Sequence, residues 1–124
     1  MILEKDGKIL LVRRNKNPYK GTWSLPGGYV EYGETVEQAV ERELLEECGL
    51  KVKIDKLLGV YSDPKRQPDK HVIAICFAAT PIAANSKATS SEGVGSFFAK
   101  NSVPPKLAFD HRKMLDDYLL RTGL

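Results

Sequence analysis

The stretch GYVEYGETVEQAVERELLEECGL, residues 28–50, decides the fold. Within it Thr35 and Gln38 form a capping-box pattern, and Gly49 is placed to end a helix, so we predict a helix over residues 36–48. One face of that helix is apolar and can pack on a sheet; it consists of Val36, Ala39, Val40 and Leu44.

A second face of the same helix is acidic. Glu43, Glu46 and Glu47 stand at i, i+3 and i+4, so their carboxylates project together within reach of one ion. Two unit charges ~6 Å apart repel by roughly 3 kcal/mol at an effective dielectric of ~20. Arg42 can offset one of these charges, and a hard divalent cation, which prefers oxygen ligands, can offset the rest. The spacing therefore predicts a metal site.

The complete pattern of this stretch is G-x5-E-x7-R-E-U-x-E-E-x-G-U, where U is a bulky aliphatic residue. It is filled without departure by Gly28, Glu34, Arg42, Glu43, Leu44, Glu46, Glu47, Gly49 and Leu50. The pattern resembles the signature box of the Nudix hydrolases, which cleave the diphosphate bond of a nucleoside diphosphate linked to another moiety. A carboxylate-rich helix alone is usually a solvated face, so the argument for a site depends on the full spacing.

The resemblance implies roles for the acidic side chains. Glu46 and Glu47 would be the principal ligands of Mg²⁺ or Mn²⁺, and the main-chain carbonyl near Gly28 would contribute. Glu34 would support the site directly or through water. Glu43 is a metal ligand in some relatives and the catalytic base in others, and both roles stay open.

Two further residues belong to the predicted catalytic set. Arg42 would orient the glutamates through charge-assisted hydrogen bonds rather than touch the substrate. Several relatives place the base on a glutamate far downstream of the box. Glu92 is the only acidic residue between Lys70 and Asp110 and precedes an aromatic strand, as such a glutamate does. Its other interpretation is a solvated loop residue.

Basic and aromatic side chains outside the box are candidates for substrate binding. Arg13 and Arg14 end a predicted strand, so alternation directs one of them inward, where it can contact a phosphate in bidentate fashion. Trp23 either stacks on a base or packs in the core. Tyr61 is predicted to stack on adenine or ribose, and Lys65 or Arg66 to bind the diphosphate. His71 and His111 are not assigned to catalysis, because structural hydrogen bonding is the simpler account of a histidine at a helix start.

The segment after the box carries a narrower resemblance. Residues 59–68, GVYSDPKRQP, look like the corresponding segment of ADP-ribose pyrophosphatases, for which a proline at the position of Pro64 is a marker, and residues 107–111 also resemble such relatives. This implies conversion of ADP-ribose to AMP and ribose 5-phosphate. An oxidised-nucleotide triphosphatase and a diadenosine polyphosphate hydrolase remain alternatives within the class. A nucleotide-sensing Nudix domain is the alternative from another class, against which the intact box argues.

Strands and helices interleave along the rest of the chain. We predict a hairpin over 2–14, strands at 23–25, 51–61 (interrupted near Asp55 or Lys56), 71–80 and 95–99, a loop over 83–91, and a last helix capped by Asp110. The run at 71–80 is apolar enough for a central strand buried on both faces. We therefore expect an α/β fold, a mixed sheet covered by helices on both sides, in agreement with the α/β/α sandwich of the resembling family. Its first strand looks clipped relative to such chains.

Length and composition limit the classes of partner. The 124 residues predict a single domain, 1–124, and a net charge of +3 is too small to argue for nucleic acid binding. No apolar run approaches the ~20 residues of a membrane span, and no secretory leader is visible, so we expect a cytoplasmic protein that acts on a small molecule. Cys48 and Cys76 are predicted to be buried free thiols. A homodimer is possible by resemblance, since two chains complete one pocket in many ADP-ribose-cleaving relatives.

Overall fold

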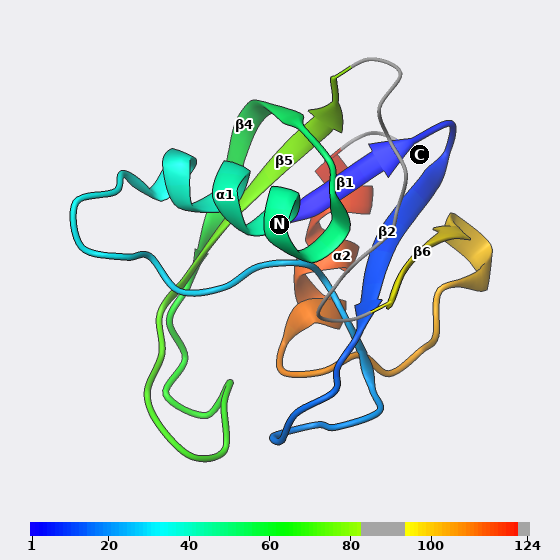
Figure 1. The fold of residues 1–124 in the computed structure, drawn as a ribbon. Helices are drawn as coiled ribbons and strands as arrows, with labels where there is room; N and C mark the ends of the chain where they lie inside the picture. Colours follow the sequence, from blue (N-terminus) through cyan, green and yellow to red (C-terminus); the bar gives the residue numbers. More distant parts are fainter. Residues whose placement is uncertain (83–93, 122–124) are drawn as a thin grey trace.

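The computed structural model describes residues 1–82 and 94–121, and the strands in this part of the chain form one six-stranded sheet with a helix on each side (Figure 1). The elements in chain order are β1 (Ile2–Lys5), β2 (Lys8–Arg13), β3 (Trp23–Ser24), α1 (Val36–Cys48), β4 (Val52–Tyr61), β5 (Ala74–Pro81), β6 (Val94–Ala99), a short 3-10 helix η1 (Lys100–Ser102) and α2 (His111–Arg121). The predicted mixed α/β class is confirmed.

The sheet is mixed because one strand pair is parallel. Its order is β3-β2-β1-β5-β4, with β6 also paired to β2, and only the β1–β5 pair among these strands is parallel. β6 pairs with β2 along its whole length, from Lys8 to Arg13. A strand has two edges, so β1 and β3 share the other edge of β2, β1 near Ile9 and β3 at Val12.

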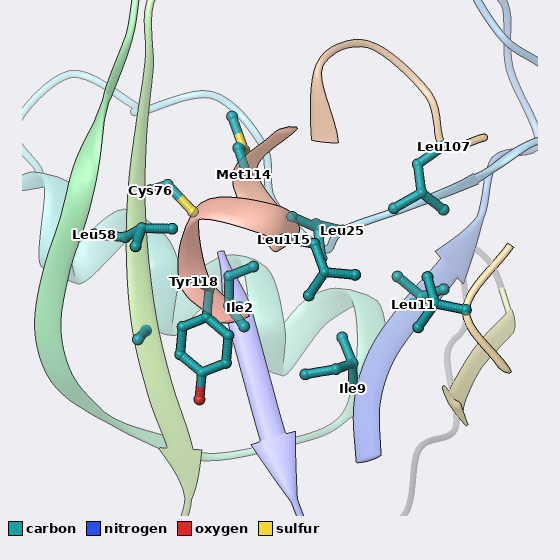
Figure 2. Packing of buried hydrophobic residues seen from close by; sticks show 12 residues of the cluster. Ile2, Ile9, Leu11, Leu25, Leu58, Cys76, Leu107, Met114, Leu115 and Tyr118 are labelled. Atoms are coloured by element: carbon teal, nitrogen blue, oxygen red, sulfur yellow. The ribbon is translucent and has the colours of Figure 1, made fainter. Parts of the chain in front are cut away.

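Consecutive residues of β1 and β2 alternate between two cores, one on each face of the sheet. On the α2 face, Ile2, Ile9 and Leu11 pack with Met114, Leu115 and Tyr118 (Figure 2). On the α1 face, Leu3, Leu10 and Val12 pack with Leu44, Cys48 and Leu50. Both faces of the sheet are thus covered here, which explains the consecutive apolar residues at 1–3 and 9–12 and confirms helices on both sides.

β4 and β5 differ in detail from the prediction. β5 lies between β1 and β4, as a central strand should, but begins at Ala74 rather than His71, and Ile73 before it is 60% exposed. β4 continues through the expected interruption, where the register shifts between Ile54 and Lys56. A bulge therefore replaces the predicted break, because the extra residue bends the strand without ending its pairing.

The helix that carries the acidic face has the predicted ends. Thr35 Oγ1 accepts from Gln38 N–H, the Gln38 side chain accepts from Thr35 N–H, and Gly49 follows with a left-handed φ of 66°. Both cysteines are buried and free, as predicted. The predicted loop over 83–91 and Glu92 lie outside the described residues. Within them, neither helix has the length and apolar content that crossing a membrane requires.

Candidate active site

Arg42 lies at the centre of the acidic cluster on α1. Its Nε and Nη2 donate to the two carboxylate oxygens of Glu34, at 2.7 and 3.0 Å. Its Nη1 donates to Glu43 Oε1 at 2.9 Å and to Glu46 Oε1 at 3.0 Å. One guanidinium thus holds three carboxylates, and its charge offsets part of their mutual repulsion.

The same arginine fixes the loop between β3 and α1. Arg42 Nη2 donates to the Tyr29 carbonyl at 3.0 Å, and its Nε lies 3.4 Å from Glu31 Oε1. Glu34 Oε1 accepts in addition from Glu31 N–H at 2.8 Å. The hydrogen bonds from Arg42, and secondly this backbone bond, lower the pKa of Glu34 below its ordinary value, while the carboxylates raise the pKa of Arg42. The charged forms of Glu34 and Arg42 are therefore favoured.

The segment Pro26-Gly27-Gly28 after β3, called the glycine turn below, approaches α1 where the acidic residues project. A Cβ built on Gly28 would come within 2.3 Å of Glu43 Cδ, so only glycine leaves room for that carboxylate. Beside it, Gly27 N–H donates to Glu47 Oε1 at 3.0 Å. The turn and the helix thus place two carboxylates and the backbone near Gly28 in one region.

These donors fit a hard divalent cation by their chemistry. Arg42 takes Oε1 of both Glu43 and Glu46, which leaves Oε2 of each side chain for another ligand. Carboxylate oxygens are the ligands that Mg²⁺ and Mn²⁺ prefer. Across the described residues, no three Asp, Glu, His or Cys side chains converge tightly enough to enclose an ion, because the carboxylates are arranged around the arginine. The argument for a cation therefore rests on the type of ligand atoms present, which are carboxylate oxygens.

A cavity of about 810 Å³ lies between this acidic region and a basic one. Glu43 and Glu47 line one part of it, and Arg13, Arg14 and Lys16 line another. The volume is in the range of small-molecule and cofactor sites. A diphosphate carries several negative charges that must be neutralised. In this cavity it could coordinate a cation beside the acidic residues and also contact the basic ones.

Two loops meet at this cavity. Lys70 Nζ lies 5.0 Å from the centre of the Tyr29 ring, and both residues line the space. A hydrogen bond from Lys70 is the largest cause that lowers the pKa of the Tyr29 hydroxyl. The contact joins the loop after β4 to the loop that follows the glycine turn.

Two of the predicted substrate contacts lie away from the cavity. Trp23 packs edge to face on Phe98, with ring centroids 4.9 Å apart, beside the core under α2. The Tyr61 hydroxyl donates to Asp117 of α2 at 2.8 Å. Neither Trp23 nor Tyr61 is among the described residues that line the cavity. For Trp23 the structure agrees with the core interpretation, and the position of Tyr61 does not agree with stacking on a ligand in this cavity.

Arg66 lines the cavity, yet its side chain is committed within the protein. Its Nε and Nη2 donate to the Asp110 carboxylate at 2.8 to 3.0 Å, and its Nη1 donates to the Val72 carbonyl at 3.2 Å. The Arg66 side chain is only 5% exposed. It therefore ties the loop after β4 to the start of α2, and Asp110, predicted as a helix cap, is its ion-pair partner.

The sequence prediction missed Phe109. Its ring lines the cavity and carries the Arg14 guanidinium over its face, 4.9 Å from the ring centre. His111, two residues on, accepts through Nδ1 from Leu25 N–H at 3.0 Å, the structural role expected of it. The resemblance at residues 107–111 was the available signal, but it pointed to a family and gave no role to Phe109.

The comparisons with known proteins show the family of the chain. A family model described as the NUDIX domain matches residues 1–118. The chain belongs to the Nudix hydrolase family. This Nudix chain is 53% identical over 118 residues to a protein of Methanocaldococcus jannaschii named ADP-ribose pyrophosphatase, covering 95% of this chain and 69% of that one.

Solved structures of Nudix proteins have the same fold as this chain. The crystal structure of a MutT NUDIX hydrolase from Burkholderia pseudomallei is 30% identical, with a TM-score of 0.80 over 94% of this chain and 92% of that one. An ADP-ribose pyrophosphatase from Streptococcus suis is 27% identical, with a TM-score of 0.78 over 99% of this chain and 88% of that one. As a Nudix pyrophosphohydrolase, the protein belongs to a family that typically uses divalent metal ions.

Proposed function

We propose that this Nudix chain hydrolyses ADP-ribose to AMP and ribose 5-phosphate with Mg²⁺, or Mn²⁺ in its place. The observation that carries the proposal is a cavity lined both by Glu43 and Glu47 and by Arg13 and Arg14, because acidic and basic side chains around one cavity suit a diphosphate held through a cation. The relative named ADP-ribose pyrophosphatase, at 53% identity, supports the choice of substrate.

The acidic residues have separate tasks in this proposal. Glu46 and Glu47 would hold the cation, with the main-chain carbonyl near Gly28 as a further ligand, and Glu43 would be either another ligand or the catalytic base. When bound, the cation neutralises charge on the diphosphate and lowers the pKa of an attacking water. Arg42 keeps the glutamates oriented through its bonds to Glu43 and Glu46.

A base must accept the proton of the water as it attacks phosphorus. Glu43 is one candidate, since its carboxylate lines the cavity and is 18% exposed. Glu92 is the other, and it lies outside the described residues. On the opposite wall, an arginine at the end of β2 binds phosphate oxygens and so lowers the charge that the nucleophile meets. The cytoplasmic location and the homodimer stay predictions.

The experiment compares nucleoside diphosphate derivatives under one set of conditions. Purified protein is incubated with MgCl₂ and ADP-ribose, a dinucleoside polyphosphate, an oxidised nucleoside triphosphate or an unmodified one, and the products are separated by chromatography. We expect AMP and ribose 5-phosphate from ADP-ribose, with a kcat/KM at least about tenfold above the other compounds. EDTA is expected to abolish product formation, and added MnCl₂ or MgCl₂ to restore it.

Two outcomes would contradict the proposal. Faster release of pyrophosphate from a nucleoside triphosphate would make the chain a triphosphatase. Tight binding of ADP-ribose by calorimetry, without turnover in the presence of either metal, would instead identify a nucleotide-sensing domain. Glu46→Gln, with the proposed cation ligand neutralised, serves as the background control for contaminating hydrolases.

A further inference from the structure

Arg14 is held at both its backbone and its side chain. Its N–H donates to the Thr22 carbonyl at 3.0 Å, and its carbonyl accepts from Gly21 N–H at 2.8 Å. Its Nε donates to the Pro18 carbonyl at 2.7 Å, and its guanidinium carbon lies 4.9 Å from the centre of the Phe109 ring. Its Nη1 and Nη2 have no further hydrogen-bond partner among the described residues. They are available to a ligand in the cavity that Arg14 lines.

Phe109 has a backbone conformation that bulky residues rarely adopt. Its φ is 56°, in the left-handed region, at a turn closed by a hydrogen bond from His111 N–H to the Ala108 carbonyl at 3.2 Å. Tyr19 is also left-handed, with a φ of 65°, and its ring meets that of Phe109 edge to face at 4.9 Å. Uncommon conformations of this kind concentrate at functional sites. Here Phe109 and Tyr19, which both have such a conformation, come from segments distant in sequence and meet beside the Arg14 guanidinium.

The residues after Phe109 anchor its turn. Asp110 receives the bidentate ion pair from Arg66, and the His111 ring accepts from Leu25 N–H. Both anchors are partly buried, so the turn is fixed from two sides. These anchors fix the chain after Phe109, and the ring itself packs against the rings of Tyr19 and His111.

The Phe109 turn lies near the acidic region. His111 binds the backbone at Leu25, and three residues later Gly28 lies against the Glu43 carboxylate. Three residues of chain span roughly 10 Å at most. Arg14 and Phe109 also line the same cavity as Glu43. A phosphate group bound in that cavity can therefore meet the Arg14 guanidinium as well as a cation held by the carboxylates.

Stacking on an aromatic ring leaves the donors of an arginine unused. When a guanidinium lies flat on a ring, its face contacts the ring and its N–H groups point outward in its own plane. Those in-plane donors match the oxygens of a phosphate. Phe109 can thus fix the orientation of Arg14 without competing for the ligand.

We propose that Arg14 binds a phosphate group of the substrate and that Phe109, braced by Tyr19, is a positioning residue that holds the guanidinium for this contact. The inference rests on the proposed function in that the anion is the diphosphate of ADP-ribose. It also distinguishes Arg14 from Arg13, the last residue of β2, since Arg13 is exposed and, among the described residues, no aromatic ring lies against its guanidinium.

The test is a double-mutant cycle between Phe109 and Arg14. Phe109→Leu keeps apolar volume but removes the ring face, and we expect the KM for ADP-ribose to rise about fivefold while kcat stays within about twofold. Arg14→Ala is expected to raise KM by about tenfold or more. In the Arg14→Ala background, Phe109→Leu should have no further effect on KM. Phe98→Leu, the same change in the Trp23–Phe98 pair, is the matched control and should leave KM unchanged.

Several results would overturn the assignment. If Phe109→Leu raises KM equally with and without Arg14, the ring acts on the substrate directly and does not position the arginine. An unchanged KM in Phe109→Leu would show that the ring contributes nothing to binding. Phe109→Gly, which suits the left-handed φ, guards against misfolding, and it should raise KM with little change in the thermal midpoint. If wild type does not cleave ADP-ribose, the proposed substrate fails, and the same cycle is run on the compound that it does cleave.

Discussion

Gly28 and Glu43 are in direct contact, with the Glu43 carboxyl group occupying the space that a side chain at position 28 would take. A Cβ there would lie 2.5 Å from both carboxylate oxygens as well as 2.3 Å from Cδ. Gly28 itself is exposed and does not have a left-handed φ. A glycine is therefore needed at position 28 to leave space for the Glu43 carboxylate, and not to allow a left-handed backbone conformation.

Gly28→Ala should separate activity from stability. The added methyl group would push the Glu43 carboxylate from its place beside Arg42, so we expect kcat to fall by about tenfold or more. Because the position is exposed, the free energy of unfolding should change by less than about 1 kcal/mol. Chemical unfolding and steady-state kinetics measure the two effects. Gly27→Ala, with no atom near the added Cβ, is the matched control, and an equal loss of activity there would contradict the argument.

Glu46→Gln tests the proposed cation ligand. The Glu46 side chain is 54% exposed and interacts with Arg42, so its neutralisation should leave the thermal midpoint near or above that of wild type while turnover is lost. The neutral glutamine is also no longer repelled by the Glu43 and Glu47 carboxylates, which likewise favours a thermal midpoint at or above that of wild type. We expect MgCl₂ to raise the thermal midpoint of wild type, and to raise that of the variant much less.

Glu41→Gln provides the comparison for this experiment. Glu41 is an exposed glutamate of the same helix and takes no part in the proposed site. It should keep both turnover and the shift of the midpoint with MgCl₂. A large loss of folding stability in Glu46→Gln would show that its side chain is structural.

The helix and its acidic face followed from local sequence, because helix caps and 3.6-residue periodicity depend on neighbours along the chain. Thr35, Gln38 and Gly49 fixed both ends of α1, and the spacing of Glu43 and Glu46 put their carboxylates on one guanidinium. The mixed sheet was predicted from the interleaving of strands and helices along the chain, in agreement with the family resemblance.

The contacts between distant segments were not predictable from local patterns. The sequence does not say whether an arginine in a loop faces a ligand or a buried carboxylate, and Arg66 meets Asp110 across 44 residues. Trp23 and Tyr61 were candidates because aromatic rings suit nucleotides, but the core and α2 hold them. Phe109 was missed because a left-handed φ at a phenylalanine has no sequence signal.

Arg66→Met should be strongly destabilising. The change leaves the Asp110 carboxylate, 17% exposed, without its partner, and breaking a buried pair in this way costs about 3–5 kcal/mol. Urea unfolding measures the loss. Arg112→Met, which breaks the more exposed pair with Asp116, is the comparison and should cost less than about 1 kcal/mol.

A second replacement shows whether the unpaired Asp110 carboxylate causes the loss of stability in Arg66→Met. Arg66→Met combined with Asp110→Leu removes both charges, and it should recover part of the stability lost in the single variant. Should Arg66→Met instead raise the KM for ADP-ribose with little change in stability, the guanidinium would be a substrate contact, as predicted from sequence.

His111 should make folding stability depend on pH. Burial, and then the positive charges of the Met1 ammonium, Arg66 and Arg14, lower the pKa of His111 from 6.5 to about 3. Between these values the unfolded chain binds a proton that the folded chain does not. The free energy of unfolding therefore falls as pH falls from about 6.5 toward 3, by up to about 1.4 kcal/mol per pH unit.

His111→Asn tests this slope, because an amide oxygen can accept from Leu25 N–H in place of Nδ1 but does not titrate. The variant should be less stable than wild type at pH 7, since the smaller side chain packs less well, and its stability should depend less on pH between 6.5 and 4. Chemical unfolding at a series of pH values gives both slopes, and the NMR signals of the wild-type imidazole should remain those of the neutral ring at pH 5. Equal slopes in the two proteins would mean that other groups set the pH dependence and that His111 gains its proton in the folded state as readily as in the unfolded one.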